Sequence, residues 1–211
     1  MLNASGNEAM MVTEVRGEIL RMLCRDVRLL ATAHLATHWF SGLKNPRERA
    51  NREARELAAA GFVNKAETSL ALIDVSTPLY VWKPGSDKPN FSRLAAANDK
   101  RWKEPLRRTQ TLTATKKAYE LYGGYQRKAV RTRELEHDAA IATLRFQMAD
   151  QLQAWTIEDG LPQAEAGQKR PDAVVQTDGK TILLEMVGRR YSADKLEQLW
   201  RAYRNQDFQF R

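Results

Sequence analysis

The segment RPDAVVQTDGKTILLEMVGRR, residues 170–190, decides which fold the C-terminal part of the chain adopts. Two apolar runs in it are separated by Asp178-Gly179, a dipeptide typical of tight β-hairpin turns. Each run carries one acid, Asp172 at the start of the first run and Glu185 near the end of the second. Because a hairpin makes its two strands antiparallel, we expect both carboxylates at the same end of a sheet.

The elements on either side of this hairpin predict a small α/β layer. An apolar stripe with helical spacing runs over residues 135–152, and the short strand-like run WTIED follows at residues 155–159. Beyond the hairpin, Ser192 is a suitable N-cap for an amphipathic helix, and DFQF at residues 207–210 offers a closing strand. The predicted order is helix, three strands, helix and strand, in a domain that spans residues 135–211.

The first part of the chain predicts three short helices and a β-hairpin. Helical spacing of apolar residues marks three segments: residues 14–27, 32–40 and 46–60. Two strand-like runs follow them: residues 64–75 and 78–85. These are the elements of a winged helix-turn-helix, so we assign residues 1–85 to such a domain. Residues 86–134, rich in Lys, Arg, Asn and Pro, are interpreted as a basic helical connector.

The composition is that of a globular protein, with 43% hydrophobic and 28% charged residues. Cys24 is the only cysteine in the sequence, which excludes an intramolecular disulfide and a cysteine-based metal site. The first residues lack the pattern of a secretion signal, and no stretch is long and apolar enough for a transmembrane helix. We therefore expect a cytoplasmic protein that does not associate with a membrane.

Positive charge is concentrated in one segment of the chain. Residues 100–134 hold eleven Lys or Arg and three Glu, a surplus equal to the net charge of +8. Such a surplus favours a polyanionic partner, because cations that neutralise phosphates release condensed counterions. A pair of solvated basic helices is the alternative interpretation.

The third predicted helix carries four arginines, and in a winged helix this element enters the major groove of DNA. Double-stranded DNA is therefore the expected partner. The expected contacts come from this helix, the hairpin and the connector: Arg47, Arg49, Arg52, Arg55, Lys65, Lys83, Lys116, Lys117, Arg127 and Lys128. The alternative is a surface helix stabilised by salt links to three interleaved acids, Glu48, Glu53 and Glu56.

The two hairpin acids are sufficient in number for a magnesium site, because Mg²⁺ takes one or two protein carboxylates beside waters and substrate phosphates. Glu158, on the preceding strand, is a third candidate acid. The pattern resembles the PD-(D/E)xK nuclease-like superfamily, with Pro171-Asp172 as the first motif and Glu185 as the acid of the second. The resemblance implies a lysine two residues beyond that acid, where this chain has Val187.

Valine cannot orient or deprotonate a water molecule, so catalysis would depend on a replacement for the lysine. Arg189 falls on the same strand face as Glu185, and Lys195 lies on the following helix. Arg189 can neutralise a phosphate, but it stays protonated and is a poor base. The candidate catalytic residues are Glu158, Asp172, Glu185 and Arg189, with Asp172 and Glu185 as ligands of Mg²⁺. In the alternative interpretation, Asp172 and Glu185 are ordinary polar residues at strand ends.

Several segments together resemble the replication-relaxation family of plasmid and mobile-element proteins, over roughly residues 15–205. The likeness rests on the order of these local patterns: LLATAHLATHWF, RELAAAGFV, PLYVWKPG, ELEHDAAI and RPDAVV. It implies an α+β protein with an N-terminal winged helix and a C-terminal PD-(D/E)xK nuclease-like domain. It also implies DNA binding, and it aligns His137-Asp138 with a paired His and Asp at the start of a long helix. The chain departs from the family after Glu185, where MVGRRY replaces an acid-containing continuation.

The sequence supports three hypotheses. The first is a DNA-binding protein of a plasmid or mobile element that acts in replication, mobilisation or transcription regulation. The second is a metal-dependent DNA endonuclease, and the third is a C-terminal dimerisation module that makes the protein a homodimer on symmetric half-sites. Under the first hypothesis, replacing Arg49 and Arg52 with alanine weakens DNA binding strongly, whereas changing Glu185 leaves it nearly intact.

Overall fold

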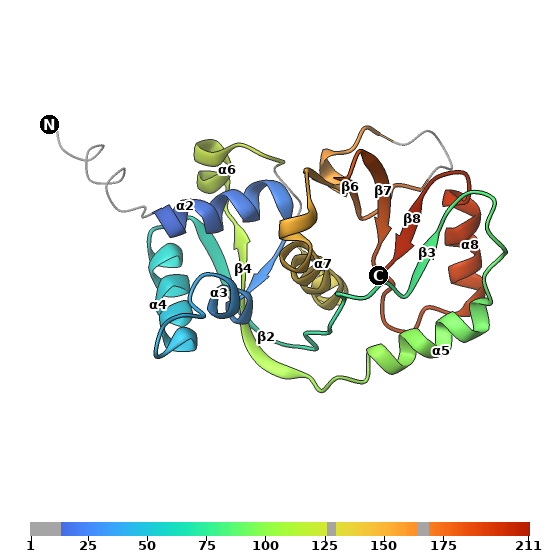
Figure 1. Cartoon of the computed structure of the whole chain (residues 1–211). Coiled ribbons are helices and arrows are strands. Elements are labelled where there is room, and N and C mark those ends of the chain that lie inside the picture. Colours follow the sequence, from blue (N-terminus) through green and yellow to red (C-terminus); the bar gives the residue numbers. More distant parts are fainter. Residues whose placement is uncertain (1–13, 126–129, 164–168) are drawn as a thin grey trace, which may run out of the picture. The chain divides into compact units, whose positions relative to one another are not determined.

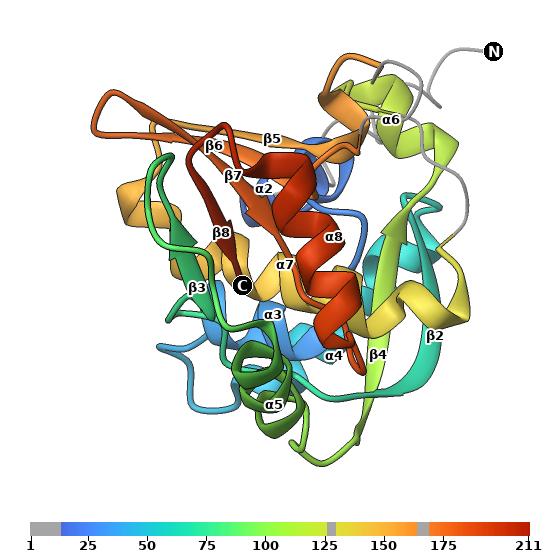
Figure 2. The same ribbon diagram turned by 90° about the vertical axis from the view of Figure 1, so that its right-hand side faces the viewer.

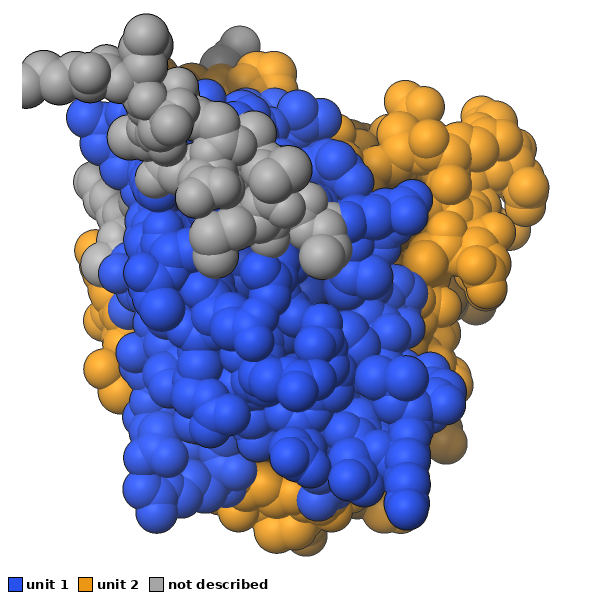
Figure 3. Space-filling view, turned by 90° about the vertical axis from the view of Figure 1, so that its left-hand side faces the viewer, with its two compact units in different colours: residues 1–68, 108–130 blue, residues 69–107, 131–211 orange. Residues whose placement is uncertain are grey.

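The computed structural model describes residues 14–125, 130–163 and 169–211 of a mixed α+β protein. The chain divides into two compact units, coloured separately in Figure 3. Unit 1 comprises residues 1–68 and 108–130, and unit 2 comprises residues 69–107 and 131–211. None of the helices in the described ranges has the length and apolarity needed to cross a membrane.

Three helices form the first part of unit 1: α2 (Glu14–Arg21), α3 (Thr32–His38) and α4 (Pro46–Ala59). Helix α2 continues into a π-helical turn, Met22–Asp26. Pro46 occupies the first turn of α4, where its missing N–H breaks no helical hydrogen bond. The small buried residues Ala50 and Ala54 let α4 pack closely on α3. The sequence prediction of these three helices is confirmed.

A three-stranded sheet completes unit 1 together with one further helix. The strands are β1 (Leu30–Ala31), β4 (Arg107–Ala114) and β2 (Val63–Leu70), in that spatial order. Strand β1 is antiparallel to β4. Helix α6 (Lys116–Tyr122) follows β4 and begins after Thr115, whose hydroxyl accepts a hydrogen bond from the N–H of Ala118. Figure 1 shows β4 beside the three N-terminal helices.

Unit 2 is built on a five-stranded sheet (Figure 2). Its strands, in spatial order, are β3 (Tyr80–Trp82), β8 (Phe208–Phe210), β7 (Lys180–Glu185), β6 (Ala173–Thr177) and β5 (Ala154–Ile157). Strands β5, β6 and β7 form an antiparallel meander, whereas β7 and β8 are parallel. The parallel pair is joined through α8 (Ala193–Tyr203), the helical crossover that parallel strands require. The predicted hairpin, final helix and closing strand are confirmed.

The two faces of this sheet are buried by different helices. Helix α7 (Leu135–Gln147) contributes Ile141 and Leu144 to one cluster, which includes Leu184 of β7. Helix α8 and α5 (Phe91–Arg101) contribute to a second cluster, which includes Leu183 of β7. Neighbouring residues of one strand thus enter opposite cores, as the alternation of side chains along a strand requires. Short 3-10 turns lie at Thr132–Glu134, Ala149–Gln151 and Glu158–Gly160.

The structure corrects the predicted N-terminal hairpin and the division of the chain. Strand β3 pairs with β8 of unit 2, and β2 instead has β4 as its sheet neighbour. Residues 86–134 are therefore no connector, because α5 belongs to unit 2 whereas β4 and α6 belong to unit 1. Residues 69–85, expected in the first domain, also belong to unit 2. The hairpin was predicted because strands that are consecutive in the chain often pair. Here, however, a segment of unit 2 is inserted between β2 and β4.

Candidate functional site

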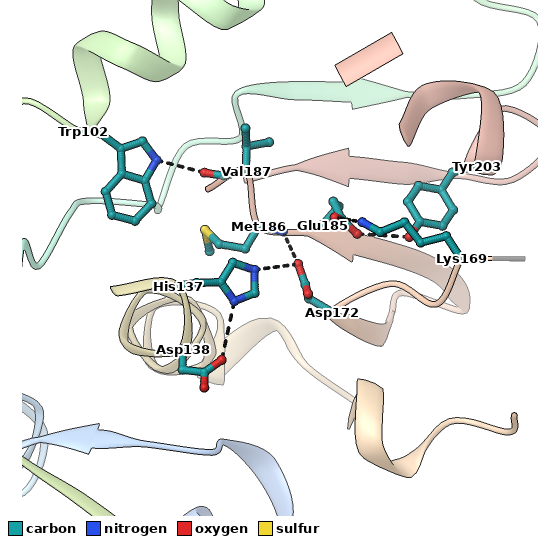
Figure 4. A network of polar contacts seen from close by, with 9 residues as sticks. All are labelled: Trp102, His137, Asp138, Lys169, Asp172, Glu185, Met186, Val187 and Tyr203. Atoms are coloured by element: carbon teal, nitrogen blue, oxygen red, sulfur yellow. Dashed lines mark hydrogen bonds and ion pairs between the residues drawn. The ribbon is translucent and has the colours of Figure 1, made fainter. Parts of the chain in front are cut away.

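The hairpin brings Asp172 and Glu185 to the same end of the unit 2 sheet. Ala173 is the register partner of Leu184, and the two acids are the next residues outward on each strand. The oxygen Oδ2 of Asp172 accepts a hydrogen bond of 2.7 Å from the N–H of Met186, the residue after Glu185. The two acids differ in their other partners, however: Asp172 contacts His137 of α7, whereas Glu185 contacts Tyr203 of α8 and Lys169, which precedes β6 (Figure 4).

Asp172 is bound by His137, which lies in the first turn of α7. The Nε2 atom of His137 is 3.2 Å from Oδ2 of Asp172, and its Nδ1 atom is 3.5 Å from Oδ1 of Asp138. Burial of the ring opposes protonation, but the charges and hydrogen bonds of Asp172 and Asp138 outweigh it and raise the pKa of His137 to about 10. His137 is therefore a cation at neutral pH, held between two carboxylates.

The same contact fixes the ionisation of Asp172. Burial alone would raise the pKa of this carboxyl. The charge and hydrogen bond of His137, together with the N–H of Met186, instead hold that pKa below its ordinary value. Asp172 and His137 thus form an internal ion pair.

Glu185 has a different environment, formed by Lys169 and Tyr203. The carboxylate is almost fully buried, its Oε1 atom forms an ion pair with Lys169, and its Oε2 atom accepts a hydrogen bond of 3.0 Å from the hydroxyl of Tyr203. Burial and the nearby negative charge of Asp172 raise the pKa of Glu185 to about 7, although Lys169 and Tyr203 act in the opposite direction. Near neutral pH the protonated and the ionised form of this acid are therefore both populated.

These contacts test whether the two acids fit the expected Mg²⁺. Three of their four carboxylate oxygens already accept hydrogen bonds or ion pairs from the protein itself. Lys169 and His137 supply two positive charges where a divalent cation would supply them. Within the described residues, moreover, no group of three His, Cys, Asp or Glu side chains is arranged to hold a metal. In this arrangement the residues do not fit an open magnesium site.

Of the other predicted catalytic residues, Glu158 is the neighbour of Asp172, because its backbone N–H donates a hydrogen bond of 2.9 Å to the carbonyl of Asp172. Glu158 directly follows β5, and its carboxylate is 3.4 Å from Nη2 of Arg170. Arg189 makes two hydrogen bonds, of 2.8 and 3.1 Å, to the carboxylate of Glu136. Val187, at the position of the family lysine, is fully buried in the α8-side cluster. Arg189 therefore does not replace the missing lysine.

Sequence reasoning missed Lys169 and Tyr203, and it singled out His137 only through the family resemblance. Lys169 lies two residues before the Pro171-Asp172 motif, so its approach to Glu185 becomes visible only once the strands pair. Tyr203 is one of the buried residues of the amphipathic helix α8, and its hydroxyl donates to Glu185. A phenol on an otherwise apolar stripe is the one signal that could have revealed this contact, because a buried hydroxyl needs a partner.

A second candidate surface lies on α4. Arg47, Arg52 and Arg55 are exposed, and within the described part of the chain none of the three has an ion-pair partner. Arg49 is different, because it forms a 2.8 Å salt bridge with the fully buried Glu53 and lies 5.4 Å from the centre of the Phe40 ring. Three of the four α4 arginines are thus available to a ligand, and the fourth belongs to the fold.

The remaining predicted DNA contacts are distributed over both units. Lys65 is exposed on β2, Lys116 lies 3.6 Å from Glu120, and Lys117 donates to the carbonyl of Ala60. Lys83 follows β3 in unit 2, so its assignment to the hairpin beside the third helix is wrong. Two further predicted contacts lie outside the described residues: Arg127 and Lys128.

Comparisons with known proteins do not identify the chain: no family model, no curated protein and no solved structure matches it. The two surfaces described above therefore carry the functional inference. One surface presents free positive charge, whereas the other pairs its charges internally.

Proposed function

We propose that this protein binds duplex DNA through unit 1, with α4 as the element that contacts the DNA. The observation that carries the proposal is the set of exposed arginines on α4 without ion-pair partners among the described residues: Arg47, Arg52 and Arg55. Guanidinium groups bind phosphate oxygens with paired N–H donors and remain charged at every physiological pH. An exposed helix with several of them is suited to a polyanion.

The arrangement around α4 supports the same proposal. Helices α2, α3 and α4 precede two strands, β2 and β4, that lie side by side in one sheet. This order agrees with a winged helix-turn-helix, in which the third helix enters the major groove and the strands contact the backbone. Lys65 on β2 adds a further exposed cation. The biological setting we propose is that of a plasmid or mobile element, where the protein acts in replication, mobilisation or transcription regulation.

The proposal is tested with the full chain and a fluorescent DNA duplex. Binding is measured by anisotropy over a series of salt concentrations for the wild type, R52Q/R55Q and the control K103Q/K180Q, which removes two exposed lysines of unit 2. We expect R52Q/R55Q to weaken binding at least tenfold and to reduce the slope of log K against log salt by about 2. Equal losses in both variants would show that α4 has no special role, and an absence of wild-type binding would refute the proposal.

A second candidate, a DNA endonuclease of the PD-(D/E)xK type, is favoured by one observation. Lys169 brings an ammonium group to Glu185, the acid beside which the superfamily lysine is missing. The candidate requires Lys169 to leave Oε1 of Glu185, because the acids as placed do not form an open ligand set. Supercoiled plasmid incubated with magnesium or manganese tests it. Nicking that D172N and K169Q both abolish would support the activity, and equal nicking by wild type and variants would indicate contamination.

A further inference from the structure

A surface hollow of about 380 Å³ lies on unit 2, away from the two acids of the sheet end. It is lined by five residues: Lys88, Glu197, Trp200, Arg201 and Arg204. Four of them belong to α8 or its C-terminal end and recur at intervals of three and four residues, which places them on one side of the helix. Lys88 comes from the segment before α5, and α5 packs against α8 (Figure 2).

The charges around the hollow do not cancel. Glu197 accepts hydrogen bonds from both Lys88, at 2.8 Å, and Arg201, at 2.7 Å. These two contacts lower the pKa of Glu197, so the carboxylate stays ionised and holds both cations in place. Arg204 has no carboxylate partner in the described part of unit 2. Three cations around one acid leave a net positive hollow.

The hollow is also lined by Trp200, a residue that is only 8% exposed. The Nζ atom of Lys88 and the Cζ atom of Arg204 lie 5.9 and 5.6 Å from the ring centroid of Trp200, within the range of cation–π attraction. The buried Nε1–H of Trp200 has no hydrogen-bond acceptor among the described residues. The hollow itself therefore offers three cationic side chains around a single acid that is already engaged.

We propose that this hollow binds a phosphate of a nucleic-acid backbone and gives unit 2 its own contact with DNA, an inference that rests on the proposed function of unit 1. The net positive charge of the hollow favours an anion, and arginine is the residue best suited to phosphate. A nucleotide with its base is disfavoured, because the Trp200 ring is covered and leaves no face on which a base could stack. A backbone phosphate needs only the cations at the rim.

The test uses Trp200 as a local reporter in the full chain labelled with ¹⁵N. Its indole N–H resonance is assigned through its loss in W200F, or by side-chain correlation spectra if that variant does not fold. A DNA duplex and pyrophosphate are then added separately to the wild type, to R201Q/R204Q and to the control K103Q/K180Q. We expect DNA to shift the resonance in the wild type and the control but not in R201Q/R204Q. We also expect R201Q/R204Q to lower the salt slope of DNA binding by about 1 to 2.

The possible outcomes separate this inference from the proposed function. If DNA binds through α4 while the Trp200 resonance stays fixed, the hollow makes no contact and only the inference fails. If pyrophosphate shifts the resonance and DNA does not, the hollow binds a small phosphate, which overturns its assignment to a nucleic-acid backbone. If the wild type binds no DNA at all, both proposals fail.

Discussion

Helix α4 of unit 1 and the acidic sheet end of unit 2 both combine cations with carboxylates, yet they use them in opposite ways. On α4, three arginines remain exposed, and only Arg49 is engaged by a buried acid. At the sheet end, His137 and Lys169 are both bound to acids. The number of charges in a segment therefore says little about function, because what matters is which charges the fold leaves unpaired.

Each region also contains one buried glutamate, and the two glutamates differ in their neighbours. Glu53 is paired with two arginines, Arg16 of α2 and Arg49 of α4. Glu185 has one cation and one phenol, and a second acid lies nearby. Burial and that second acid raise the pKa of Glu185 to about 7. The sheet end is thus the more pH-sensitive of the two regions.

The largest effect on stability is expected from H137L, which removes the histidine cation of the sheet end. Asp172 and Asp138 would then be left partly or fully buried without their positive partner, so we expect unit 2 to lose about 3 kcal/mol of stability. Urea denaturation followed by tryptophan fluorescence measures this loss. The double variant H137L/D172N should recover part of it, and full additivity of the two substitutions would show that the ion pair contributes nothing.

The pH dependence of the same variant follows from the raised pKa of His137. The pKa of His137 is about 10 in the folded state, against an ordinary value of 6.5. The stability that charged His137 contributes to unit 2 is therefore fully present below pH 6.5 and is lost as the pH rises towards 10. Wild-type unit 2 should therefore lose stability over this interval, and H137L should lose less. Parallel pH profiles of the two proteins would contradict the assignment of a charged His137.

The next largest effect is expected from E53Q in unit 1. Glu53 accepts from Arg16 and Arg49, and weakening these charge-assisted bonds should cost about 2 kcal/mol. DNA affinity should not fall, because the change removes a negative charge from α4 and releases Arg49. E48Q, an exposed substitution on the same helix, is the matched control for charge and should alter stability by less than about 0.5 kcal/mol. Weaker DNA binding in a folded E53Q would argue against α4 as the contact.

A smaller effect is expected from Y203F at the sheet end. The substitution removes the hydroxyl that donates to Oε2 of Glu185, at a cost of about 1 to 2 kcal/mol when that acid is ionised. Since the pKa of Glu185 is about 7, the cost should be larger at pH 8.5 than at pH 5.5, where the acid is protonated and accepts a weaker hydrogen bond. Denaturation of wild type and Y203F at both pH values measures the difference, and an equal cost at the two pH values would show that Glu185 does not titrate in this range.

Local signals in the sequence predicted most of the elements. Asp178-Gly179 adopts positive φ at both residues, as a tight hairpin turn requires, and Pro46 begins α4. The pairing of β3 with β8 had no such signal, because neither strand differs locally from one that pairs with its neighbour in sequence. The two acids of the site were found because one hairpin joins them. Lys169 was missed because its approach to Glu185 depends on the pairing of strands that come later in the chain.

The smallest effect expected concerns the helix caps of the two units. Ser192 caps α8 with one hydrogen bond of 3.2 Å from the N–H of Lys195, so S192A should destabilise unit 2 by about 1 kcal/mol. Thr115 caps α6 in unit 1, and its hydroxyl also donates to the carbonyl of Gly61 at 2.7 Å. T115A should therefore cost more than S192A, since it leaves that carbonyl without its donor as well. Thermal denaturation of the two variants measures both costs. An equal loss would mean that the Gly61 contact adds nothing, and that the cap in each unit contributes only its local hydrogen bond.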